Sequence, residues 1–314
     1  MGVVRNWMTG LGEIYDTFRF PPQFIHNMDE TMLDSSGHKV KVLVRSTSPR
    51  SFTENEVKWE HITLALCVSA TGAPITPLVI FPLKTEPYLL PVVKHFFHIS
   101  GQENGFIIND IWHEWVEKTY IPHIEDLRVQ LNLPHQKALL IVDSHSTRKH
   151  KPTIELFEKH NIMVHILPAY SSTILQPLDL TVNGEFKHLL KLCFQPRTGE
   201  DTPTKRSRLM YTTVECLQGA FLAMHIKDGF ARAGIWPYNT EAPLNSSLVR
   251  YESDTINFAP PPKRKRGPSI AGKVLTYGNP PLVIQANTQP ISTPPTQAID
   301  TSLNHQILQL ILPH

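Results

Sequence analysis

Three aspartates lie where the chain passes from regular structure into a loop, and their type and placement indicate metal chemistry. Asp29 ends a short strand-like run, Asp143 closes the apolar run 138–142, and Asp179 follows the Gln-Pro-Leu of 176–178. Hard divalent cations prefer oxygen ligands, and Mg²⁺ is usually held by one or two carboxylates together with waters and substrate phosphates. The set therefore suggests metal-assisted phosphodiester chemistry.

Each acid taken alone has a simpler explanation. Asp143 could cap the helix expected near Thr153 or stabilise a loop turn, and Asp29 could form a turn with its own backbone. Asp179 precedes a helical stretch, where aspartate is a preferred capping residue. Glu30 follows Asp29 directly, so on a strand it points to the opposite face. Only one acid of this adjacent pair can then share a site with Asp143, and we favour Asp29.

The elements that must position these acids are predicted from hydrophobic periodicity and turn residues. The first strands are separated by turn sequences and are expected to pair antiparallel, whereas the later strands alternate with helices and are expected to be parallel. This order predicts an α/β fold with a mixed sheet flanked by helices. The predicted strands are 24–28, 39–44, 62–69, 138–142 and 162–167, and the predicted helices are 3–20, 107–127, 153–160 and 184–193.

The composition changes near residue 240. Residues 259–298 are rich in proline and contain few aromatics, which is typical of a segment that does not pack. We therefore expect a lead-in helix and linker at 1–22, a folded domain at 23–240, and a mostly disordered tail at 241–314.

The overall composition limits the class of protein. The chain has 314 residues, of which 41% are hydrophobic, and a formal net charge of +2, so it can bury a sizeable core and its charge alone does not indicate nucleic-acid binding. It lacks a long apolar stretch and a basic-then-apolar leader, and we expect a soluble intracellular protein. Cys67, Cys193 and Cys216 lack the close spacing of a zinc site.

Four sequence blocks, taken in order, resemble the three acidic blocks and the closing segment of the catalytic domain of pogo/Tigger-type transposases, which include centromere-protein-B/jerky-like proteins and belong to the DDE/DDD endonuclease superfamily. The resemblance covers about residues 10 to 240, and four ordered blocks are a specific signal where any one alone would be weak. The blocks are HNMDET (26–31), LIVDSH (140–145), LPAYSSTILQPLD (167–179) and GFARAGIWPYN (229–239).

The resemblance implies an RNase H-like fold with a five-stranded mixed sheet. In that fold the first acid lies on strand one, the second on strand four beside it, and the third on a helix after strand five. It also implies that Asp29, Asp143 and Asp179 are both catalytic and metal-binding, holding two Mg²⁺ or Mn²⁺ ions that act on DNA. The 35 residues between Asp143 and Asp179 suit this family. Self-association into a homodimer and docking of the tail on another protein stay open.

Two basic runs are candidates for nucleic-acid contact or targeting. Arg148, Lys149 and Lys151 follow Asp143 and would neutralise phosphates beside the metal site, although a solvated charged loop is an equal alternative. The run Lys263, Arg264, Lys265 and Arg266 is typical of a nuclear localisation signal or a nonspecific nucleic-acid patch. The histidines beside the acids, His26 and His145, receive no catalytic role.

The leading hypothesis is a transposon-derived, metal-dependent DNA endonuclease and strand transferase located in the nucleus. Transposases of this type usually carry N-terminal helix-turn-helix modules that recognise element ends, and no second recognition helix fits before Asp29. A catalytically silent nuclear DNA-binding or chromatin-interaction protein is therefore the alternative. An unrelated metal-dependent phosphoesterase is a third and weaker one.

Overall fold

The computed structural model of the chain describes residues 2–33, 61–84, 87, 89–195, 197 and 199–246. The predicted strand 39–44, the Pro-rich tail and the basic run 263–266 lie outside these residues. The described strands are β1 (Ile25–Leu33), β2 (Ile62–Ser69), β3 (Pro74–Phe81), β4 (His98–Gly101), β5 (Ala138–Val142) and β6 (Ile162–Ile166). The α-helices are α1 (Gly2–Phe18), α2 (Pro91–Phe96), α3 (Asn109–Trp115), α4 (Ile121–Gln130), α5 (Lys151–Lys159), α6 (Ser172–Leu175), α7 (Pro177–Leu180), α8 (Val182–Cys193), α9 (Thr202–Ala220) and α10 (Ala223–Arg232).

The strands form one mixed sheet in the order β4-β3-β2-β1-β5-β6. The pairs β1–β2 and β2–β3 are antiparallel, whereas β1–β5, β5–β6 and β3–β4 are parallel. The five strands β3-β2-β1-β5-β6 reproduce the RNase H-like arrangement, which confirms the predicted fold class. The described sheet has six strands where five were predicted. Neither β3 nor the short β4, which adds a parallel edge beside β3, was predicted.

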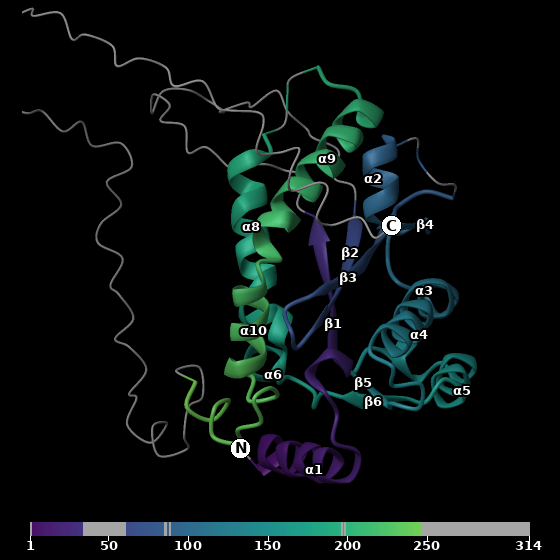
Figure 1. Ribbon diagram of the computed structural model, residues 1–314. Coiled ribbons are helices and arrows are strands. Elements are labelled where there is room, and N and C mark those ends of the chain that lie inside the picture. Colours follow the sequence, from purple (N-terminus) through teal and green to yellow (C-terminus); the bar gives the residue numbers. More distant parts are fainter. Residues whose placement is uncertain are drawn as a thin grey trace, which may run out of the picture. The chain divides into compact units, whose positions relative to one another are not determined.

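Alternation along the strands divides the core into two layers. In β5, Leu139 and Ile141 pack on one face with residues of α8, α9 and α10, and Ala138, Leu140 and Val142 pack on the other with residues of α3 and α4. Figure 1 shows these helix groups on opposite sides of the sheet. Every residue of β5 is buried, as predicted for a strand covered on both faces. The strand β6 was predicted to be buried too, but it is an edge strand and mostly half-buried.

The predicted helix 107–127 corresponds to a continuous helical segment that is interrupted by one π-helical turn. The π-helical turn η2 (Val116–Tyr120) joins α3 to α4, and Pro122 lies in the first turn of α4. Proline has no amide hydrogen and its ring clashes with the preceding turn, so a locally wider helix accommodates it. The segment still places Trp112 and Trp115 in the core beneath the sheet.

Candidate functional site

Asp29 and Asp143 lie at the same end of two neighbouring parallel strands. The last paired row of β1 and β5 is Asn27 with Ile141. Asp29 lies two residues further along β1, and Asp143 follows directly after the last residue of β5. Because side chains alternate along a strand, Asp29 belongs to the sheet face of Asn27, whereas Asp143 lies just past the end of β5. Asp29 lies within β1, so it is not the turn residue of the simpler alternative.

Asp179 is brought to this end of the sheet by α7. A buried polar network fixes the start of that helix: the Asn27 side chain donates to the carbonyl of Ile141 at 3.0 Å and to Gln176 Oε1 at 3.2 Å. Asn27 Oδ1 in turn accepts from the amide of Leu178 at 3.1 Å, and Gln176 Nε2 donates to the carbonyl of Met28 at 3.1 Å. One amide from the first sequence block and one from the third therefore join β1, β5 and α7.

The fourth sequence block packs against α7 through Gly229 of α10. A Cβ atom on Gly229 of α10 would collide with the carbonyl oxygen of Pro177 and approach Thr181 Oγ1 to 2.7 Å. Only glycine permits this close contact between α10 and α7. Asp179 itself lies inside α7 and caps neither α7 nor α8, whose N-cap positions are Gln176 and Thr181.

Asp29 and Asp179 form a close carboxylate pair. Asn183 Nδ2 donates to Asp29 Oδ2 at 2.7 Å and to Asp179 Oδ1 at 3.0 Å, so one amide touches both acids. Burial first, and then the negative charge of Asp179, raise the pKa of Asp29 to about 8. In the metal-free protein the pair therefore tends to retain a proton at neutral pH.

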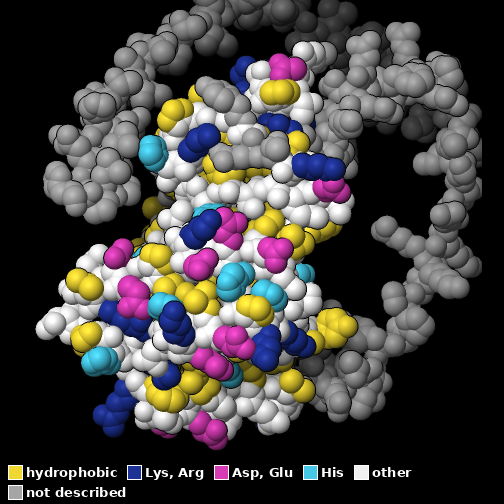
Figure 2. Space-filling view, turned by 90° about the vertical axis from the view of Figure 1, so that its right-hand side faces the viewer, with side chains coloured by type: hydrophobic (Ala, Val, Ile, Leu, Met, Phe, Trp, Pro, Cys, Tyr) yellow, Lys and Arg dark blue, Asp and Glu magenta, His cyan; other side chains and the backbone are white. Residues whose placement is uncertain are grey.

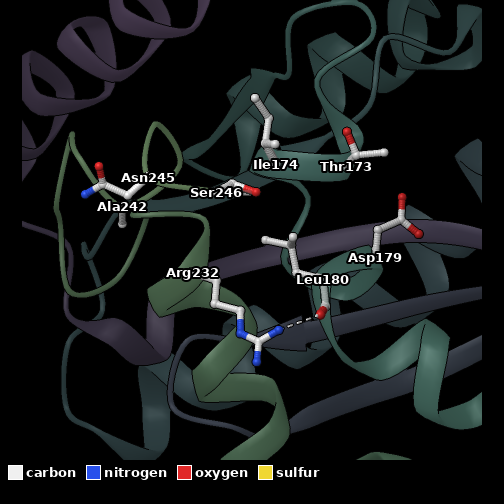
Figure 3. Close-up of a pocket in the computed structure, with 8 residues that line it drawn as sticks. All are labelled: Thr173, Ile174, Asp179, Leu180, Arg232, Ala242, Asn245 and Ser246. Carbon is white, nitrogen blue, oxygen red and sulfur yellow. Dashed lines mark hydrogen bonds between the residues drawn. The ribbon is translucent and has the colours of Figure 1, made fainter. Parts of the chain in front are cut away.

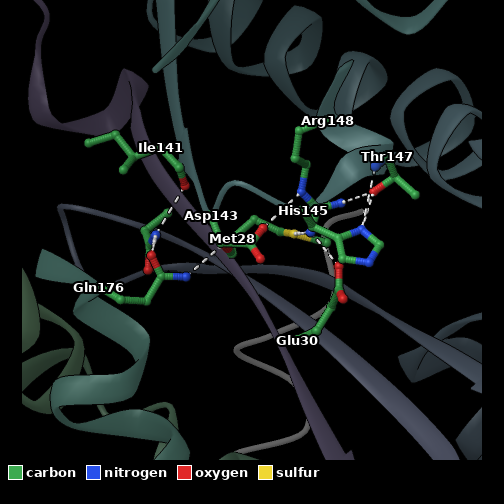
Figure 4. Close-up of polar contacts among 9 residues, drawn as sticks. Met28, Glu30, Ile141, Asp143, His145, Thr147, Arg148 and Gln176 are labelled. Carbon is green, nitrogen blue, oxygen red and sulfur yellow. Dashed lines mark hydrogen bonds and ion pairs between the residues drawn. The ribbon is translucent and has the colours of Figure 1, made fainter. Parts of the chain in front are cut away.

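Asp143 lies in the opposite electrostatic setting, because an arginine holds it. Arg148 Nε contacts Asp143 Oδ1 at 3.3 Å, and its other nitrogens donate to Glu30 and to Thr147 Oγ1. The guanidinium also stacks on the Trp112 ring, 4.3 Å from its centroid. Figure 4 shows Arg148 between Asp143 and Glu30. A single buried cation thus joins the end of β5 to β1.

The predicted role of Arg148 in phosphate contact does not fit this placement. Its side chain is fully buried and already bonded to two carboxylates, whereas a phosphate contact requires an accessible cation. Lys149 and Lys151 are exposed, and Lys151 makes only a long surface contact with Glu155 at 3.7 Å. The phosphate-contact prediction is therefore kept for the two lysines alone.

The donor set suits a hard cation, but the three predicted ligands are only partly assembled. Asp29 and Asp179 share a hydrogen-bonding partner, and Asp143 is turned toward Arg148. Among the residues that the structure describes, no group of three or more His, Cys, Asp or Glu side chains is arranged to hold a metal ion. Carboxylate and amide oxygens are nevertheless the ligands that Mg²⁺ accepts. The residues present fit such an ion once Asp143 joins the pair.

An open pocket of about 680 Å³ adjoins Asp179. Figure 3 shows Arg232 of α10 directed toward the backbone of Leu180, with Thr173 and Asp179 on the same border. The Arg232 guanidinium donates weakly to the Leu180 carbonyl at 3.5 Å and pairs with Asp228 at 2.8 Å. The pocket thus combines a cation and hydroxyl groups beside a candidate metal ligand.

The opposite side of the molecule has a different surface. Figure 2 shows the face formed by α3, α4 and α5, where Lys and Arg side chains are mixed with Asp and Glu. Among the described residues, this face therefore carries no continuous stripe of basic side chains that could follow a DNA duplex.

Sequence reasoning found the three acids but missed the amides and the arginine that hold them. Asn27 and Gln176 lie inside the recognised blocks, and Asn183 lies four residues after Asp179, across the junction between α7 and α8. That spacing was the available signal for Asn183. No comparable local signal joins Arg148 to Glu30.

The strand order, with one acid on β1 and another directly after β5, defines the RNase H-like fold. Residues 59–217, half of the chain, match the DDE superfamily endonuclease family, and the chain belongs to that family. The match includes Asp143 and Asp179 and begins after Asp29, so the place of Asp29 in the site rests on the geometry above. The pogo/Tigger subtype stays a prediction.

Known proteins resemble the chain more distantly. A protein named MFS-type transporter clz9, from Cochliobolus lunatus, is 28% identical over 224 residues, which are 66% of this chain and 22% of that protein. The chain thus spans about a fifth of this relative. In the part of the chain that the structure describes, no helix is long and apolar enough to cross a membrane.

Solved structures of the Mos1 transposase are similar at low identity. A pre-cleavage Mos1 transpososome is 13% identical, with 70% of this chain and 62% of that chain covered and a TM-score of 0.44. The Mos1 mariner catalytic domain is 12% identical, with 70% and 92% covered and a TM-score of 0.40. At these scores the similarity carries no argument about substrate or mechanism.

Proposed function

We propose that the chain is a metal-dependent DNA endonuclease and strand transferase of transposon origin, with Asp29, Asp143 and Asp179 as its metal ligands. The observation that supports the proposal is the Asp29–Asp179 pair, which Asn183 joins on β1 beside the end of β5 that Asp143 follows. Family membership supports the endonuclease activity, while the metal dependence and the strand transfer are our proposal.

The chemistry needs charge neutralisation and positioning more than a protein nucleophile. When bound, two Mg²⁺ or Mn²⁺ ions would activate a water or a DNA 3′-hydroxyl and stabilise the leaving oxygen. The Asp29 carboxyl would release its proton to solvent on binding a cation, which would offset the charge of Asp179. Arg148 holds Asp143 at the end of β5 and remains anchored by Glu30.

DNA is the proposed substrate and partner. Exposed Lys149 and Lys151 lie close in sequence to Asp143, and Arg232 lies in the pocket beside Asp179. Cations on either side of the acids suit a phosphodiester backbone that crosses the end of the sheet. We propose that these three side chains contact phosphates and that the pocket receives part of one strand.

The test is nicking of supercoiled DNA by the purified chain with Mg²⁺ or Mn²⁺ present. We expect the D143N variant to lose nicking by on the order of a thousandfold, since it removes an electrostatic contribution at the reacting centre, while DNA binding is largely retained. Asp110 is an exposed acid on α3, and D110N is the matched control that should nick normally. Equal nicking by D143N and the unmodified chain would refute the assigned site.

A catalytically silent DNA-binding or chromatin-interaction protein is the second candidate. The observation that favours it is the ion pair between Asp143 and Arg148, which occupies a predicted metal ligand. Under this alternative the chain binds DNA equally well in EDTA and in Mg²⁺, and it nicks DNA with neither Mg²⁺ nor Mn²⁺.

Nuclear localisation is also a proposal, and it rests on the basic run 263–266 outside the described residues. A fluorescent fusion should accumulate in the nucleus, and changing all four cations to Gln should disperse it. Unchanged nuclear accumulation of the altered fusion would count against this run as the signal.

A further inference from the structure

Asn183 is a buried amide at the centre of the Asp29–Asp179 pair. It lies in the first turn of α8 and is 2% exposed. Its nitrogen donates to both acids, at 2.7 Å to Asp29 and 3.0 Å to Asp179. The same planar group carries an oxygen, Asn183 Oδ1, which is buried and has no hydrogen-bonding partner among the described residues.

A helix cap is the ordinary reason for an asparagine near a helix start, and it does not apply here. A capping side chain accepts a hydrogen bond from a backbone amide two or three residues later. The Asn183 oxygen accepts none, and its nitrogen is directed to carboxylates instead. The orientation is therefore set by the acids.

The unpartnered oxygen has a direct physical meaning. Buried polar atoms are nearly always bonded, and a native exception often marks a place for a water or an ion. Here the exception belongs to the amide that touches two carboxylates of the candidate metal site. Amide oxygens are accepted ligands of hard cations, directly or through a bound water.

We propose that Asn183 is the fourth member of the cation site, where Nδ2 holds the Asp29 and Asp179 carboxylates side by side and Oδ1 coordinates the cation or accepts a hydrogen bond from its bound water. This inference rests on the proposed function, because it presumes that these acids hold a divalent ion. It makes Asn183 a positioning residue and an oxygen donor, and it gives a reason for the four-residue spacing from Asp179.

The test measures Mn²⁺ binding to the full chain without DNA, by calorimetry or by loss of the free-ion electron paramagnetic resonance signal. The N183A variant removes both the donor and the oxygen, and it should bind Mn²⁺ about 10- to 100-fold more weakly, the usual cost of losing such a support. N109A, which changes an exposed asparagine of α3, is the matched control and should bind normally. Wild-type affinity in N183A overturns the proposal.

The N183D variant separates the oxygen from the nitrogen. It keeps an oxygen donor, so Mn²⁺ affinity should equal or exceed that of the unmodified chain. Its metal-free form should melt at a lower temperature, because three carboxylates then crowd one place. Affinity as weak as that of N183A would overturn the oxygen-donor assignment, and N183D decides the matter if N183A fails to fold.

The outcomes distinguish this inference from the proposed function. If the unmodified chain binds no Mn²⁺, the metal site and the role of Asn183 fail together. If it binds Mn²⁺ and N183A binds equally well, only the role of Asn183 fails.

Discussion

The two halves of the candidate site hold the same kind of side chain in opposite electrostatic surroundings. Asp29 faces a second carboxylate, Asp179, and burial raises its pKa to about 8. Asp143 faces the guanidinium of Arg148, which Glu30 also contacts. Among the described residues, no cation pairs with Asp29 or Asp179, whereas Arg148 already pairs with Asp143.

The difference shows how the chain can hold three acids together before any cation is bound. Three bare carboxylates at one end of a sheet would repel one another, particularly where water is partly excluded. The pair Asp29–Asp179 reduces this cost by retaining a proton and by sharing Asn183, whereas Asp143 is neutralised by Arg148. Cation binding must therefore displace a proton in one half and share or loosen an ion pair in the other.

Removing Arg148 would leave the carboxylates of both halves without a neighbouring positive charge. It should therefore produce the largest loss of stability. In R148M, Glu30 and Asp143 lose their partner, and breaking a buried pair by removing one member costs several kcal/mol. We expect about 3 kcal/mol of the free energy of unfolding to be lost, the lower end of that range, because both acids are partly exposed. Urea denaturation in EDTA measures this loss.

Lys149 provides the matched control, since it is adjacent and exposed. K149M should change the free energy of unfolding by no more than about 0.5 kcal/mol. Mg²⁺ should raise the melting temperature of R148M more than that of the unmodified chain, because two carboxylates are left without a cation. An R148M protein as stable as K149M would mean that the arginine does not support Asp143.

Removing the charge of Asp29, in the other half of the site, should instead increase the free energy of unfolding. A raised acid pKa means that the folded chain binds more protons than the unfolded chain between about pH 4 and pH 8, so this group lowers stability as pH rises through that range. D29N cannot ionise and lacks this loss. In EDTA at pH 8.5 it should be more stable than the unmodified chain by on the order of 1–3 kcal/mol.

The pH dependence separates charge relief from general repacking. The advantage of D29N should shrink as pH falls from 8.5 to 5 and vanish near pH 4, where the aspartate of the unfolded chain is protonated as well. Thermal melts over this range, with D110N as the exposed-acid control, measure it. A constant advantage at all pH values, or a loss of stability at pH 8.5, would contradict the raised pKa of Asp29.

The fold could be predicted where the pattern is local and uninterrupted. The run 138–142 and the amphipathic pattern of 153–160 correspond to β5 and α5 within a few residues. The strand β3 was missed because Pro77 breaks its pattern. The pairing of β2 with β3 shifts register between Ala65 and Cys67, which leaves Pro77 in an irregularity where no ladder amide is needed.

The acids of the site could be predicted, but their surroundings could not. Each acid belongs to a recognisable sequence block, whereas the contact of Arg148 with Glu30 joins residues more than a hundred positions apart. Lysine and arginine near an acid in sequence indicate exposed charge as readily as a buried pair. In the structure the Trp112 ring packs against the guanidinium, and Glu30 and Asp143 pair with it, which keeps Arg148 buried.

The smallest expected effect concerns Arg232, which lies on the border of the pocket beside the uncompensated half of the site. Its ion pair with Asp228 is at the surface, where both side chains are about half exposed, and exposed pairs contribute little to stability. R232Q should therefore leave the melting temperature unchanged. If a phosphate binds there, the variant should weaken DNA binding severalfold and reduce the slope of log affinity against log salt by about 1.

Lys227 is the matched control, because it is an exposed cation on the same helix that does not border this pocket. Fluorescence anisotropy with a duplex at several salt concentrations compares R232Q with K227Q in EDTA, so that the acids contribute no bound cation. A loss of slope in R232Q alone places the DNA strand beside Asp179, where a cation is most needed to offset the paired carboxylates. Equal slopes in both variants would place the phosphates elsewhere, and the exposed lysines after Asp143 would then be the next cations to change.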